Sequence, residues 1–140
     1  MNDPAIEAMR DTLIEAACAV RANAYVPYSH YAVGAAILMD DGRIFTGVNI
    51  ENASYGGTVC AERTAVFKAV SEGARQIRAI AVCTANGVAP CGLCRQVLAE
   101  FASPEQDPPV WMVDEAGMIR ETTLFALLPD SFGPQHLHQD

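Results

Sequence analysis

Three cysteines and a glutamate stand near the start of two expected helices, in a pattern that can support metal chemistry. Cys60 and Glu62 belong to the segment VCAER, and Cys91 and Cys94 belong to the segment PCGLCR further along the chain. Residues three apart share one face of a helical turn. The positive end of a helix favours the thiolate, which is the form that binds a metal. If the two helix starts adjoin, Cys60 supplies a third sulfur ligand.

Three thiolates suit tetrahedral Zn²⁺, and three protein ligands leave one position for water, which is typical of catalytic zinc. Glu62 can reach that water if Cys60 faces the metal from a frayed first turn. Two alternatives remain open. A thiol–disulfide oxidoreductase would use Cys91 and Cys94 without Glu62, and a structural zinc module would need a fourth protein ligand. The combination of C-A-E with P-C-x-x-C favours a zinc deaminase, whose signature has this form.

The composition predicts a folded protein with a small ligand. Of the 140 residues, 51% are hydrophobic and 19% are charged, and the net charge is -8 with Lys68 as the only lysine. The length predicts a single domain over residues 1–140. The chain lacks the basic track that attracts nucleic acids and anionic membranes, so neither is expected as a partner. A cytoplasmic protein is expected, because the sequence shows no signal-peptide pattern, no apolar run of ~20 residues and an odd number of cysteines.

The hydrophobic pattern predicts a three-layer α/β fold. Asp3 and Pro4 are typical of a helix start, and apolar residues then recur with helical spacing as far as Val20. Two strands over 32–39 and 43–48 are expected to be joined by a tight turn at Gly42. Further helices are expected over about 60–73 and 91–101 and near 124–128, and strands over 77–84, 110–113 and 118–121. This order predicts a mixed central sheet of about five strands with helices on both faces.

Five ordered segments run nearly from end to end of the chain: PYSHYAVGAA (27–36), GVNIENASY (47–55), CAERTA (60–65), PCGLCRQ (90–96) and LLPDSF (127–132). Together they resemble the small homotetrameric zinc-dependent cytidine deaminases. The resemblance implies a cytidine-deaminase-like fold and one zinc ion per chain. It also implies that Cys60, Cys91 and Cys94 are the zinc ligands and that Glu62 is the catalytic proton shuttle.

The resemblance implies binding roles for other residues. Asn49 and Glu51 match the family's Asn-x-Glu, which holds the ribose, and an amide with a carboxylate can satisfy a hydroxyl as both donor and acceptor. Arg63 matches an arginine beside the sulfur ligands, where its hydrogen bonds would offset the charge of three thiolates. The remaining implied substrate-binding residues are Tyr31, Ala61, Tyr55 and Phe132. Tyr31 stands where the family has an aromatic residue, often Phe.

The implied activity is hydrolytic deamination of cytidine and 2'-deoxycytidine to the uridine nucleosides and ammonia, a reaction of pyrimidine salvage. A deaminase of an aminonucleoside antibiotic is the alternative. Tyr55 and Phe132 match positions through which neighbouring subunits complete each active site, so a homotetramer with shared sites is expected. Four other residues match no ligand position: Cys18 and Cys83, expected to be core thiols, and His136 and His138, expected in a solvated tail.

Overall fold

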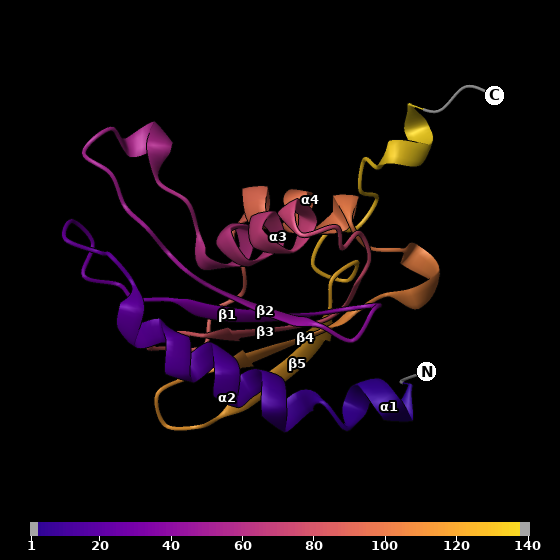
Figure 1. Cartoon of the computed structure of the whole chain (residues 1–140), viewed down its shortest axis with the longest axis horizontal. Coiled ribbons are helices and arrows are strands. Elements are labelled where there is room, and N and C mark those ends of the chain that lie inside the picture. The colour runs from indigo at the N-terminus through magenta and orange to yellow at the C-terminus, as the bar shows by residue number, and fades with distance from the viewer. Residues whose placement is uncertain (1–2, 138–140) are drawn as a thin grey trace.

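Five strands form one sheet, and helices cover both of its faces (Figure 1). The computed structural model describes residues 3–137. Its helices are α1 (Pro4–Glu7), α2 (Arg10–Val20), α3 (Ala61–Ser71) and α4 (Gly92–Glu100), and its strands are β1 (Gly34–Met39), β2 (Ile44–Val48), β3 (Ile77–Cys83), β4 (Pro109–Val113) and β5 (Ile119–Thr123). None of the helices in this part of the chain is long and apolar enough to cross a membrane. The predicted mixed sheet between two helical layers is confirmed.

The order of the strands brings two helix starts together. The order is β2-β1-β3-β4-β5, in which β3 and β4 form a parallel pair. Because β1 is antiparallel to both β2 and β3, these two strands run in the same direction and end at the same edge of the sheet. Helix α3 follows β2 and helix α4 follows β3, and both cover the same face. Their N-termini therefore lie close together at that edge.

Each face of the sheet has its own apolar core. One core lies under α3 and α4 and includes Ile80 and Leu98, and the other lies under α2 and includes Leu13. Successive side chains of a strand point to opposite faces of the sheet, so β1, β3 and β4, which are buried on both sides, contribute to both cores. Trp111, the chain's single tryptophan, is completely buried under α2, and its Nε1 donates a hydrogen bond to Glu121 Oε1 at 2.8 Å.

The predicted first helix is interrupted. Its start is as expected, since the Asp3 carboxylate accepts a hydrogen bond from the Ala5 N–H at 2.9 Å. The Met9 N–H then donates to the Ile6 carbonyl, a step of three residues in place of four. Helix α1 therefore ends at Glu7, and α2 begins as a separate helix.

The predicted helix near 124–128 is wrong, because this segment forms turns. The Leu124 N–H donates to the carbonyl of Pro108, and the Phe125 N–H donates to the Asp107 carboxylate. These partners lie outside the segment, so its first N–H groups are committed to tertiary contacts. Pro129 also disfavours the helical conformation in the residue before it.

Two glycines of the β1–β2 hairpin are needed for different reasons, one for the turn and one for close packing. Gly42 has a φ of 89°, in the left-handed region that favours glycine, and this confirms the predicted tight turn. Gly47 lies against α3, where an added Cβ would stand 2.5 Å from the Ala61 carbonyl oxygen and 2.5 Å from the Ala65 nitrogen. The backbones of β2 and α3 are therefore in direct contact next to Cys60.

Candidate active site

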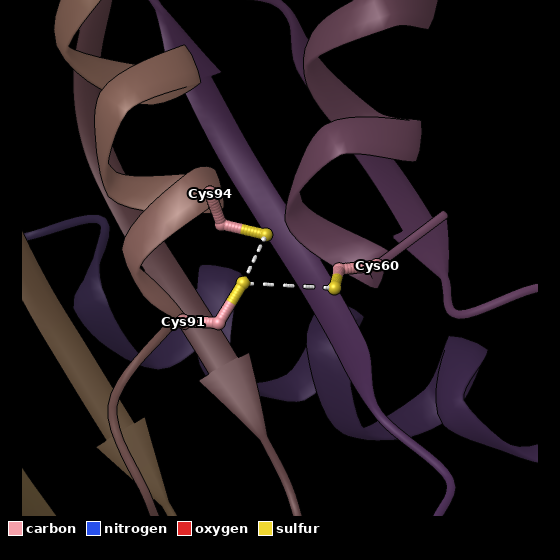
Figure 2. Close-up of side chains that lie close together, drawn as sticks. All are labelled: Cys60, Cys91 and Cys94. Carbon is pink, nitrogen blue, oxygen red and sulfur yellow. Dashed lines mark hydrogen bonds between the residues drawn. The ribbon is translucent and has the colours of Figure 1, made fainter. Parts of the chain in front are cut away.

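The three sulfur atoms expected to bind a metal lie together at the two helix starts (Figure 2). Cys60 precedes the first residue of α3, Cys91 precedes that of α4, and Cys94 lies in the first turn of α4. The Sγ atoms of Cys60 and Cys91 are 3.9 Å apart, and those of Cys91 and Cys94 are 3.3 Å apart. All three lie within 4.8 Å of one another. The condition set by the sequence, that the two helix starts adjoin, is met.

The surroundings of Cys60 favour negative charge on its sulfur. Hydrogen bonds from the Cys94 thiol, from Arg63 and from the Cys91 thiol lower the pKa of Cys60 to about 5. Arg63 Nη2 lies 3.5 Å from this sulfur, and the contact raises the pKa of Arg63. The hydrogen bond to Cys60 and burial raise the pKa of Cys94. The cluster thus favours a thiolate at Cys60 beside the Cys94 thiol, whose proton a bound metal would replace.

This donor set fits zinc. Zn–S bonds of about 2.3 Å in a tetrahedron place the sulfurs about 3.8 Å apart, close to the separations in this cluster. Thiolates suit Zn²⁺, whereas Mg²⁺ and Ca²⁺ prefer oxygen ligands. Cys60, Cys91 and Cys94 would hold the ion, and within residues 3–137 no His, Asp or Glu joins their cluster. Three protein ligands leave a position for water, as catalytic zinc sites do.

Glu62 is a buried acid beside this cluster. It lies in the first turn of α3, and only 4% of its surface is exposed. Burial raises the pKa of its carboxyl to about 7, and the negative charge of Cys60 adds to this effect. A carboxyl group with a pKa near neutrality is suited to accept and release protons.

A cavity of about 340 Å³ joins the acid and the sulfurs to the neighbouring loops. Six of the predicted site residues line it: Tyr31, Asn49, Glu51, Cys60, Glu62 and Cys91. The rest of its wall consists of apolar and hydroxyl side chains, with no Lys, Arg or His among its described lining residues. Its size and its few polar groups suit a small, uncharged ligand.

Asn49 and Glu51 hold the adjacent loop as well as lining the cavity. The Asn49 amide accepts a hydrogen bond from one N–H and donates to one carbonyl in the backbone of residues 31–33, at 2.9 and 2.7 Å. The Glu51 carboxylate accepts hydrogen bonds from the N–H groups of Tyr28 and Ser29 and from the Ser29 hydroxyl. These bonds, with that of the hydroxyl foremost, lower the pKa of Glu51. Both side chains keep hydrogen-bonding capacity for a ligand, since an amide has two donors and a carboxylate about four acceptor sites.

The structure adds contacts for two of the predicted site residues, Tyr31 and Ala61, that the sequence pattern did not specify. The hydroxyl of Tyr31 donates a hydrogen bond to Asn86 Oδ1 at 2.5 Å. Sequence reasoning missed Asn86, whose only visible signal was a turn-forming Asn-Gly pair. Ala61 is completely buried under β2 and does not line the cavity, so its side chain has no access to a ligand there.

Tyr55 and Phe132 lie outside the cavity of their own chain. Tyr55 is 77% exposed and Phe132 is 55% exposed. The loop that carries the short turn at 55–57 projects from one end of the sheet, and the C-terminal segment projects from the other (Figure 1). The described chain therefore does not bring these two aromatic residues to its own sulfur cluster.

The residues without a predicted site role also have places in the fold. Cys18 and Cys83 lie against each other between α2 and β3, and burial together with this contact raises the pKa of Cys83 to about 12. His136 is exposed and stacks on Phe132, as expected of a residue in a solvated tail. His138 lies outside the described residues.

Comparison with known proteins gives one consistent result. The model of the cytidine and deoxycytidylate deaminase zinc-binding region matches residues 8–106. The cytidine deaminase of Halalkalibacterium halodurans is 51% identical over 92% of this chain and 98% of its own length, and that of Sporosarcina psychrophila is 50% identical over 91% and 93%. The crystal structure of the cytidine deaminase from Burkholderia pseudomallei, 48% identical, superposes with a TM-score of 0.82 over 87% of this chain and 98% of that one. Together with the sulfur cluster, these matches show that the chain belongs to the cytidine and deoxycytidylate deaminase family.

Proposed function

We propose that this protein is a zinc-dependent cytidine deaminase, which converts cytidine and 2'-deoxycytidine to uridine and 2'-deoxyuridine. The observation that carries the proposal is the buried acid Glu62, which shares one cavity with the metal-binding sulfurs and with the pair Asn49 and Glu51. A thiol–disulfide oxidoreductase would use only Cys91 and Cys94, whereas a third sulfur, that of Cys60, joins them here. The relatives are named cytidine deaminases, which favours a pyrimidine nucleoside over an aminonucleoside antibiotic.

The reaction requires two proton transfers that one buried carboxylate can perform. A zinc ion held by Cys60, Cys91 and Cys94 supplies the Lewis acidity that activates water at neutral pH. Glu62 accepts a proton from the attacking water and delivers it to N3 of the pyrimidine. Glu62 then takes the proton of the new hydroxyl on C4 and passes it to the exocyclic amine, so the C4–N bond breaks, C4 becomes a carbonyl and neutral ammonia leaves. Cytidine and water thus give uridine and ammonia.

The surrounding residues position the nucleoside and adjust the charge. Asn49 and Glu51 bind the ribose, and their hydrogen bonds to the adjacent loop hold them in place for that purpose. Orientation of this kind is a large source of rate enhancement. Arg63 donates to Cys60 and offsets part of the negative charge of the three thiolates, which preserves the acidity of the metal.

The variant Glu62→Gln tests this assignment. The amide keeps the size of the side chain but cannot accept the proton, so we expect kcat to fall by about 10⁴-fold, the upper end for general acid–base catalysis. Zinc content and folding should be unchanged because Glu62 is not a ligand. Glu100→Gln, an exposed position at the end of α4, is the matched control. A Glu62→Gln protein with near-normal turnover, or one that has lost its zinc, would show that Glu62 has another role.

We propose further that the protein is a homotetramer in which subunits complete each other's active sites. Tyr55 and Phe132 are large, exposed and outside their own cavity, so their side chains can contact a neighbouring subunit. Light scattering combined with a dilution series checks this proposal. Activity should fall as the assembly dissociates, and a fully active monomer would contradict the sharing of sites.

We also propose that the protein works in the cytoplasm, as one domain over residues 1–140. All five cysteines are free thiols, and a reducing compartment keeps such thiols available for a metal. Cell fractionation checks the location. Limited proteolysis checks the single domain. Every stable fragment should contain all five strands, β1 to β5.

A further inference from the structure

The short segment that leads into β1 is held from several elements at once. Its backbone, over residues 31–33, accepts a hydrogen bond from Arg21 Nε at 2.8 Å and is bound on both sides by the Asn49 amide. The side chain of Tyr31 is held separately, by the hydrogen bond of its hydroxyl to Asn86 Oδ1. Backbone contacts alone would leave the ring free to turn about its side-chain bonds, so the bond to Asn86 is what fixes the ring.

This bond joins two of the loops that line the cavity. Tyr31 lies on the loop that precedes β1 and is among the residues that line the cavity. Asn86 lies on the loop from β3 to α4, whose residues Thr84, Val88 and Cys91 also line the cavity. Asn86 itself is exposed and does not line the cavity. The bond therefore ties the ring to the loop that leads to the sulfur cluster without occupying the space of a ligand.

The Asn86 end of this bond is firmly anchored. Asn86 forms a β-bridge with Asp114, at the turn that follows β4. The loop beside it is held by the buried Thr84 hydroxyl, which accepts a hydrogen bond from the Gly87 N–H at 2.7 Å. A partner that is fixed in this way can fix the position of the ring in turn.

We propose that Tyr31, through its hydrogen bond to Asn86, is a positioning residue that sets the width of the cavity between its ring and the loop leading to Cys91. The nucleoside base is thereby held against the metal centre. This inference rests on the proposed deaminase function. It assigns a role to the hydroxyl, which a phenylalanine at this position could not fill.

A double-mutant cycle with Tyr31→Phe and Asn86→Ala tests the inference, with cytidine as the substrate. Each single variant should lower kcat/KM by about three- to tenfold, the equivalent of one ordinary hydrogen bond. The double variant should be no worse than either single variant, because all three lack the same bond. Asn86→Asp keeps an acceptor for the Tyr31 hydroxyl and should restore kcat/KM to within about twofold of wild type. The zinc content should be unchanged throughout.

Hydrogen exchange provides a readout that does not depend on activity. Amides in residues 84–89 should exchange faster in Tyr31→Phe and at the wild-type rate in Asn86→Asp. Unchanged exchange in Tyr31→Phe would overturn the inference whether or not the enzyme deaminates cytidine, whereas inactive wild-type protein with altered exchange in the variant would overturn the proposed function alone. The inference would also be overturned if the double variant lost kcat/KM by the product of the two single losses, or if Tyr31→Phe kept the wild-type kcat/KM. If Asn86→Ala does not fold, Tyr31→Phe and Asn86→Asp decide the question.

Discussion

Replacing Gly47 by alanine tests whether the contact between β2 and α3 sets the position of the active site. The added Cβ would stand 2.5 Å from two backbone atoms of α3, the Ala61 oxygen and the Ala65 nitrogen. Ordinary contact begins near 3.4 Å, so strand and helix must separate by about 0.9 Å. Backbone atoms of a helix cannot turn aside as the end of a flexible side chain can. The whole first turn of α3 must therefore move.

This displacement should lower both the stability of the fold and the catalytic efficiency. Overpacking a well-packed contact destabilises a protein by about 1–3 kcal/mol. In a chain of this length each kcal/mol lowers Tm by about 3–4 °C, so we expect a decrease of about 3–12 °C. The moving turn carries Glu62 and follows Cys60 directly. A misplacement of about 1 Å can reduce catalysis by about 10²-fold, and a loss of kcat/KM of that order is expected.

Thermal unfolding followed by circular dichroism, zinc analysis and steady-state kinetics measure these effects. Gly56→Ala is the matched control, because a Cβ at that position meets no atom within 4 Å and the backbone there is not left-handed. The control should keep the wild-type Tm and zinc content. A Gly47→Ala protein with the same Tm as the control would show that the backbones of β2 and α3 are not in close contact at Gly47. A lowered Tm with unchanged kcat/KM would show that the site is not positioned through this contact.

Three further outcomes are expected. Cys60→Ala leaves two thiolates and should lose its zinc on dialysis against a chelator that the wild-type protein withstands, as measured by atomic absorption; a full equivalent of retained zinc would remove Cys60 from the ligand set. Free cytosine should have a much lower kcat/KM than cytidine, because it lacks the ribose that Asn49 and Glu51 bind, and equal values would refute that assignment. CMP should also be a poor substrate, since the described cavity offers no Lys, Arg or His to a phosphate and Glu51 repels it; efficient turnover of CMP would contradict this reading of the cavity.

The helix starts that carry the sulfurs could be predicted because their signals are local. The pattern P-C-x-x-C places Cys91 and Cys94 on one turn, and the length of the apolar segments places strands before both helices. The meeting of Cys60 with Cys91 was a conditional expectation, since it depends on strand order. The observed order, in which β1 separates β2 from β3, satisfies the condition.

Features that depend on contacts between distant segments could not be predicted in the same way. The apolar segment 124–128 has a helical composition, but its first two N–H groups bond to Pro108 and Asp107, and this tertiary contact overrides local propensity. Asn49 was expected to bind a ligand, and its second task of holding residues 31–33 is visible only in three dimensions. Asn86 carries no chemical signal of its own, because its role arises from the loop that packs opposite it.

The buried Trp111 makes the protein its own optical probe. Its indole lies in the core under α2, whereas the cavity is lined by side chains such as Val82 that belong to the core under α3 and α4. With excitation that selects tryptophan over the four tyrosines, the fluorescence therefore comes from one shielded indole on the face of the sheet away from the cavity. A red shift on heating reports that water has reached the α2 core, and filling the cavity leaves the emission where it was. Fluorescence can thus follow the unfolding of every variant without a label, and independently of what occupies the active site.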